Sequence, residues 1–119
     1  MKPGYLLLLC FLLPACEAPV AANTLVYIDN SAIQCEFRGK PPAETAALLE
    51  DAGVTVQESF CAYRTGMAIA AMCGTGDLNI NVHRISESDL ALAGELGLKP
   101  AADLGRNGDQ GYAQADCPE

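Results

Sequence analysis

The sequence is poor in aromatic residues and in positive charge. Aromatic residues make up 6% of its 119 positions and tryptophan is absent, so the hydrophobic core must be small. Seven Lys and Arg residues stand against 15 Asp and Glu residues, for a net charge of −8 at pH 7. Nucleic acids and anionic membranes both attract clustered positive charge, so we expect no nucleic-acid partner and no electrostatic adhesion to lipid. A chain of this length has room for one domain.

The sequence also lacks an apolar run long enough to span a membrane. Its N-terminal run, Tyr5–Leu13, has nine residues, whereas a helix that crosses the hydrocarbon core needs about 20. The run follows Lys2 and the terminal amine, and it ends at Pro14 and small residues. This pattern is typical of a cleavable signal peptide, which we place at residues 1–15, and it predicts export.

The residues that follow the apolar run, Leu13-Pro14-Ala15-Cys16, resemble the lipobox of bacterial lipoproteins. The resemblance covers residues 1–17 and implies lipidation of Cys16, with the membrane as a partner through this anchor. Pro14 departs from the small or β-branched residue that is usual at its position. The resemblance also implies an outer-membrane protein facing the periplasm, because Glu17 replaces the Asp that resembles an inner-membrane retention signal.

A second cleavage site remains open. Small residues at Val20-Ala21-Ala22 allow ordinary signal cleavage, which would leave a soluble periplasmic or secreted protein that starts at Asn23. Under the lipoprotein interpretation residues 16–24 form a lipidated tether, residues 25–99 the folded domain and residues 100–119 an irregular tail.

The cysteine pattern predicts disulfides rather than a metal site. Both cleavage routes leave the same four cysteines, and an even count in a small exported domain is typical of two disulfides. The four residues are Cys35, Cys61, Cys73 and Cys117. Three connectivities are open, and we guess Cys61–Cys73 with Cys35–Cys117, which would pin the tail to the domain. Zinc sites usually contain close C-x2-4-C pairs, which are absent, so we expect no metal and no cofactor.

Apolar periodicity predicts a mixed α and β domain. Short strands are expected at 25–28, 54–63 and 78–83, and a further one is open at 67–73. Helices are expected at 43–52, ended by Gly53, and at 89–96, opened by a capping-box pattern at Ser86-x-x-Asp89. The order strand, helix, strand, strand, helix predicts a small truncated ferredoxin-like α+β sandwich. Both helices should cover one sheet face, and a disulfide-rich edge should gather the four cysteines.

Catalytic motifs are scarce. The single histidine, His83, should lie opposite Ile80 and Val82 on its strand, on the surface or half-buried, and no nucleophile is evident beside it. Gly74-Thr75-Gly76-Asp77 is interpreted as a tight turn because it lacks the lysine and the helix of a phosphate loop. Met67, Met72 and Cys73 leave a soft copper(I) site as a less favoured alternative.

The coarse topology behind a lipoprotein signal resembles SPOR domains, which implies peptidoglycan binding. The chain departs from them in having few aromatic residues and no predicted final strand. The segments Gln34-Cys35-Glu36, Cys73-Gly74 and 78–85 also resemble a group of small uncharacterised proteobacterial proteins, which implies no particular activity. We therefore expect a non-enzymatic envelope lipoprotein that binds a periplasmic protein or cell-wall partner. A soft-metal or thiol-handling protein and a SPOR-like module are the alternatives.

Overall fold

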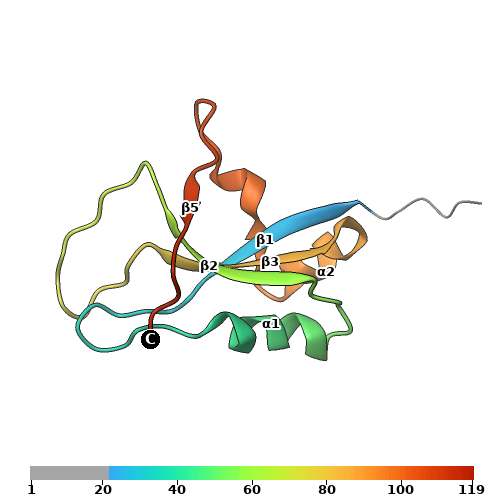
Figure 1. The fold of residues 1–119 in the computed structure, drawn as a ribbon, viewed down its shortest axis with the longest axis horizontal. Helices are drawn as coiled ribbons and strands as arrows, with labels where there is room; N and C mark the ends of the chain where they lie inside the picture. Colours follow the sequence, from blue (N-terminus) through green and yellow to red (C-terminus); the bar gives the residue numbers. More distant parts are fainter. Residues whose placement is uncertain (1–21) are drawn as a thin grey trace, which may run out of the picture.

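A computed structural model of the chain describes residues 22–119 (Figure 1). It forms an α+β domain with a five-stranded antiparallel sheet, two α-helices and two short 3-10 helices. In chain order the elements are β1 (Asn23–Asp29), α1 (Pro42–Asp51), β2 (Glu58–Arg64), β3 (Asn79–Ser86), a 3-10 turn (Glu87–Asp89), α2 (Leu90–Glu95), β4 (Lys99–Pro100), a second 3-10 turn (Ala101–Leu104) and β5 (Tyr112–Gln114). The N-terminal signal and lipobox predictions lie outside these residues.

β3 is the central strand of the sheet, whose order is β4-β1-β3-β2-β5. β1 and β2 both pair with β3 in antiparallel fashion, so they run parallel to each other on either side of it. The predicted α+β class is therefore correct. The sheet order and strand count differ from the truncated five-element sandwich, because β4 and β5 add a strand at each edge.

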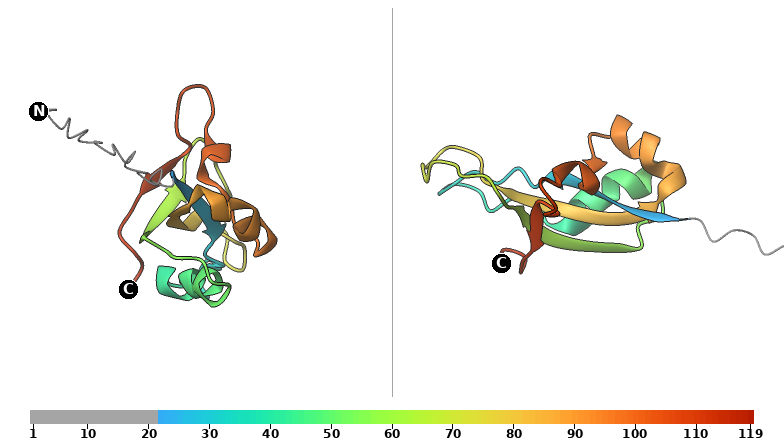
Figure 2. Two further views of the ribbon diagram at one scale, coloured as in Figure 1. Left: turned by 90° about the vertical axis from the view of Figure 1, so that its right-hand side faces the viewer. Right: turned by 90° about the horizontal axis from the view of Figure 1, so that it is seen from above.

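Both helices cover one face of the sheet, as the sequence predicted (Figure 2). α1 begins with proline in its first turn, where a missing backbone N–H costs nothing, and Gly53 follows it with a φ of +90°. Leu49 of α1 and Ala93 of α2 pack on Val26 and Ile85 of the sheet, and all four side chains are buried. This cluster is the main hydrophobic core.

The C-terminal segment packs on the opposite face of the sheet. Most of residues 100–119 are irregular, as predicted, but the segment also contains a 3-10 turn and β5, which the prediction did not include. Leu104 from the second 3-10 turn packs with Ile80 and Val82 of β3, and Tyr112 from β5 packs against the same cluster. The tail could not be assigned from periodicity because β4 and β5 have two and three residues, too few to display a strand pattern.

Two local predictions fail. The segment 67–73 forms no strand and is exposed throughout. Ser86 does precede the 3-10 turn that leads into α2, but its side chain makes no capping hydrogen bond and meets the hydroxyl of Ser88 instead, so the capping box is absent. Within residues 22–119 no helix has the length and hydropathy of a membrane span.

Candidate functional site

Two long loops project from one end of the sheet and are joined to each other. The first connects β1 to α1 over residues 30–41, and the second connects β2 to β3 over residues 65–78. Figure 1 shows both at the left, away from the start of β1. A disulfide between Cys35 and Cys73 links them. We refer to the two segments together as the braced loops.

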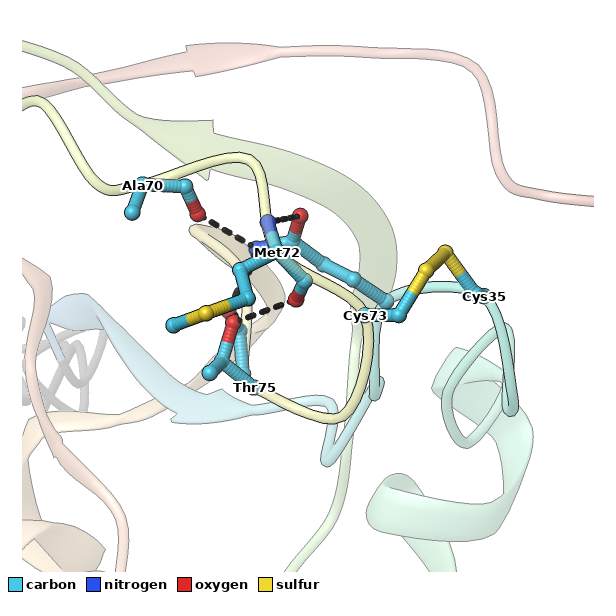
Figure 3. Close-up of a disulfide and its surroundings, with 7 residues drawn as sticks. Cys35, Ala70, Met72, Cys73 and Thr75 are labelled. Carbon is cyan, nitrogen blue, oxygen red and sulfur yellow. Dashed lines mark hydrogen bonds between the residues drawn. A yellow bond between two sulfur atoms is a disulfide. The ribbon is translucent and has the colours of Figure 1, made fainter.

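Gln34, the chain neighbour of Cys35, organises the second loop from the first. Figure 3 shows the Cys35–Cys73 disulfide with Ala70, Met72 and Thr75 of the second loop. The side-chain amide of Gln34 donates to the carbonyls of Ala70 and Gly76 at 3.1 and 3.0 Å, and its side-chain oxygen accepts from the Met72 amide at 3.0 Å. Its backbone amide donates to the Thr75 carbonyl at 2.9 Å. One side chain and one disulfide therefore hold a long segment without secondary structure in a defined shape.

The Gly-Thr-Gly segment is part of this bracing. Thr75 Oγ1 donates to the Met72 carbonyl at 2.7 Å, and Gly74 has a φ of +88°, a conformation that favours glycine. The interpretation of Gly74–Asp77 as a turn agrees with this geometry. Sequence reasoning missed Gln34, because a single glutamine beside a cysteine carries no recognisable pattern.

The braced loops carry most of the exposed large apolar side chains in the described chain. Seven such side chains are exposed, and five of them lie on these loops. The five are Ile33, Phe37, Met67, Ile69 and Met72. Met72 has 55% of its surface exposed and Phe37 has 48%, values that core residues of a small domain do not show. A cluster of this kind at the end of a domain is typical of an interaction surface.

Charge is distributed unevenly around this surface. An open hollow of about 440 Å³ lies along the first loop, and Glu36, Arg38 and Asp77 bring both signs of charge to its wall. The second loop has no charged residue from Thr65 to Gly76. The segment Thr65–Gly76 is therefore uncharged and largely apolar within a strongly acidic protein.

The guessed disulfide connectivity is wrong. The structure pairs Cys35 with Cys73 and Cys61 with Cys117, rather than Cys61 with Cys73 and Cys35 with Cys117. Cys73 lies within the second loop and is bonded to Cys35 of the first loop, not to Cys61 on β2. Cys117 follows β5, which pairs with β2 and so brings the tail beside Cys61. The prediction of two disulfides is correct.

This pairing removes the residues that a soft-metal site needs. Cys73 is oxidised, so it offers no thiolate beside Met67 and Met72. Among residues 22–119, no group of three or more His, Cys, Asp or Glu side chains is arranged to hold a metal ion. Cys16, the predicted lipidation site, lies outside the described residues.

His83 is buried in a polar network between the sheet and α1, so the prediction of a surface or half-buried histidine is wrong. Strand alternation does place it opposite Ile80 and Val82, but α1 covers that face and the residue is 0% exposed. Its Nε2 lies 2.7 Å from Thr45 Oγ1, and its Nδ1 lies 2.6 Å from Ser59 Oγ. Periodicity could place His83 on a face but could not show that α1 lies over it.

Thr45 joins His83 to the rest of this network. Thr45 Oγ1 lies 3.2 Å from the Pro42 carbonyl oxygen and accepts from the side-chain amide of Asn81 at 3.1 Å. The hydroxyl has one proton, which goes either to the Pro42 carbonyl or to His83 Nε2, and the neutral imidazole takes the matching tautomer, with Ser59 Oγ as the partner of Nδ1 in both cases. Burial lowers the pKa of His83 from 6.5 to about 4.

Ser59 and His83 thus form a hydroxyl–imidazole pair that the sequence did not reveal. The pair joins neighbours directly opposite each other on β2 and β3. Its chemistry differs from that of a catalytic triad, because Nε2 meets a threonine hydroxyl instead of a carboxylate that would stabilise the imidazolium. A pKa of about 4 also makes His83 a weak base at neutral pH. The geometry fits a structural tie between α1 and the sheet.

Asn81 completes the network. Its side-chain amide donates to the Lys40 carbonyl at 2.9 Å as well as to Thr45, which fixes the start of α1 over β3. Its Oδ1 is buried without a hydrogen-bond partner in the described chain. An apolar replacement could not supply the two donated bonds, so this asparagine positions α1 at some cost in solvation.

Comparisons with known proteins identify no relative of this chain. No protein-family model matches the chain, and searches of the curated proteins and of the solved structures find no match either.

Proposed function

We propose that this protein is an exported, membrane-anchored binding module that acts through its braced loops and is not an enzyme. The observation that carries the proposal is the concentration of exposed apolar side chains on two loops held rigid by a disulfide and by Gln34. A rigid apolar surface loses little conformational entropy when a partner covers it, which favours binding. The hydroxyl–imidazole pair, by contrast, has no carboxylate partner and a weak base.

The two disulfides are consistent with an oxidising compartment and hence with export. We propose that Cys16 carries the lipid anchor and that the protein faces the periplasm from the outer membrane. The alternative is a soluble periplasmic protein cleaved before Asn23. We also propose that the sandwich is a ferredoxin-like variant with an added edge strand, on the ground that β1 and β2 flank β3.

The position of the loops supports a partner beyond the anchoring membrane. β1 begins at Asn23, close to the proposed anchor, and runs for seven residues before the first loop starts. At about 3.3 Å per residue this strand separates the anchored end from the loops by roughly 20 Å. The apolar surface therefore lies at the end of β1 opposite the proposed anchor, where a protein or a cell-wall component could reach it.

The proposal is tested by crosslinking in intact cells. We would compare the wild-type chain, the variant Ile69→Ser with Met72→Ser, and the control Leu48→Ser, which removes an apolar side chain of similar exposure from α1. Loss of crosslinked adducts in the loop variant with retention in the control is the expected result. Adducts that persist unchanged in the loop variant would overturn the assignment of the surface.

The anchor is tested separately by the intact mass of the mature protein. A triacylated chain that starts at Cys16 is expected, whereas an unmodified chain that starts at Asn23 would replace the lipoprotein with the soluble form. Either mass should show the loss of four hydrogens that two disulfides require. Four free thiols would instead restore the thiol-handling alternative.

A further inference from the structure

We propose that the partner of the braced loops is a second copy of this chain, and that Met67–Ala71 of one copy pairs in antiparallel fashion with Met67–Ala71 of the other. This inference rests on the proposed function, since it names the partner of the same surface. It commits to a two-fold symmetric dimer, in which each copy offers the same segment to the other.

Most of the backbone of this segment is available for pairing; the exception is the Ala70 carbonyl, which accepts from the Gln34 side chain. Within residues 22–119, no backbone hydrogen bond engages the amides or carbonyls of Gly66–Ile69, and every residue from Gly66 to Gly74 is exposed. The edges of the folded sheet are protected by contrast, because β4 has two residues and ends in Pro100, and β5 has three. The second loop is thus the long exposed segment where another strand can add.

Electrostatics favour contact at this segment over other parts of the surface. Two copies of a chain with a net charge of −8 repel each other wherever their acidic residues approach. Thr65–Gly76 is a run of twelve residues without a charged side chain. Two copies that meet there bring apolar side chains together and keep their acidic groups apart.

The order of side chains in the segment is self-complementary about Ile69. In an antiparallel pair centred there, Ile69 faces Ile69, and Met67 faces Ala71 in both halves. Each large Met67 therefore meets a small Ala71, which lets the two strands approach closely. Ala68 and Ala70 face each other on the other side of the pair.

A lipid surface fits the same side chains less well. Insertion of Gly66–Ile69 into hydrocarbon would bury backbone groups that have no partner, which is unfavourable because lipid tails cannot accept or donate hydrogen bonds. A second copy of the segment supplies those bonds. The disulfide and Gln34 hold the flanking residues in place, so pairing orders little additional chain.

The pairing is tested first with Ile69→Cys in the full-length chain, expressed in cells and oxidised with copper phenanthroline under air. Residues that face each other in an antiparallel pair lie within reach of a disulfide, so a covalent dimer is expected on a non-reducing gel. The wild-type chain and the matched control Leu48→Cys, at an exposed position of α1, should give no covalent dimer on the same gel. An absent dimer, or an equal yield from Leu48→Cys, would overturn the proposal.

A charge pair tests the register. Met67→Lys with Ala71→Glu places opposite charges face to face in both halves of the dimer, whereas Met67→Lys with Ala71→Lys places like charges there. Sedimentation velocity of the purified proteins should show at least tenfold weaker association for the second variant than for the first. Equal association would overturn the register and with it the proposal. Binding of monomers to phosphatidylcholine vesicles without any dimer would replace it with a lipid-binding loop.

The two proposals fail in different ways. Crosslinked adducts that depend on Ile69 and Met72 but contain another protein would leave the binding module standing and refute the homodimer. Adducts of twice the chain mass would support both.

Discussion

Acidification should weaken the fold through His83, the one histidine in the chain. The buried imidazole has a pKa of about 4, whereas in the unfolded chain it returns to about 6.5. Between these values the unfolded state binds the proton and the folded state does not, so stability is lost as pH falls from about 6.5 to about 4. The structural cause is the burial of the ring under α1, with hydroxyl groups as its partners and no carboxylate to stabilise the charged form.

The size of the effect follows from the two pKa values. Full protonation of the unfolded chain alone corresponds to about 3.4 kcal/mol, because each pKa unit is worth about 1.36 kcal/mol. At pH 5 about 2 kcal/mol of this is already lost, and at pH 7.5 almost none. For a small domain whose total stability is about 5 to 15 kcal/mol, a loss of 2 kcal/mol is readily measured.

Urea unfolding followed by far-ultraviolet circular dichroism, at several pH values between 7.5 and 5, measures this loss. His83→Gln is the reference variant, because it lacks the titrating group but keeps the carboxylates that also titrate near pH 4. The variant should be less stable at pH 7.5 by about 1 to 3 kcal/mol, from lost hydrogen bonds, and the difference should shrink on acidification. Parallel pH profiles for the two proteins would refute the assignment of a buried neutral imidazole.

Three further outcomes test the fold and the site. Gly111→Ala should destabilise the protein by at least about 2 kcal/mol more than Gly108→Ala in thermal unfolding, since both glycines have positive φ but a Cβ overlaps the backbone only at Gly111. Thr45→Val should cost about 1 to 3 kcal/mol in urea, because it removes the hydroxyl that His83 and Asn81 both contact, and a neutral result would show that this network does not stabilise the fold. Joint replacement of Cys35 and Cys73 by Ser should preserve the circular dichroism spectrum and speed hydrogen exchange in the braced loops; unchanged exchange would show that the disulfide does not hold them.

Periodicity predicted the elements with the most residues and failed on the shortest ones. Helix α1 was predicted within one residue of its observed bounds, and strands β1 and β3 were found but extend beyond the predicted ranges, because their apolar residues repeat at helical or strand spacing. β4 and β5 are too short to show a periodic pattern of apolar residues. They form because they pair with the edges of β1 and β2. Their detection required the tertiary arrangement.

The candidate site was predictable only in part for a similar reason. The count of four cysteines predicted two disulfides, but connectivity depends on where the second loop folds, and nothing in its sequence shows that it returns to Gln34. The apolar stretch 67–73 was recognised, and a strand there was left open, but the segment forms none. A short apolar run becomes a strand only where a neighbouring strand is present to pair with it, and among residues 22–119 none pairs with this segment.

The two disulfides stabilise different parts of the molecule although the chain-entropy model gives them similar weight. They close segments of 38 and 56 residues, which in that model corresponds to about 4 kcal/mol each. Cys61 is buried on β2, and its bond to Cys117 holds the end of the tail beside that strand. The same tail carries Leu104 and Tyr112, which pack on the second face of the sheet. Cys35 and Cys73 are exposed and lie outside both hydrophobic clusters. Their bond contributes nothing to a core and instead holds the two loops in one shape, which is what the proposed binding surface requires.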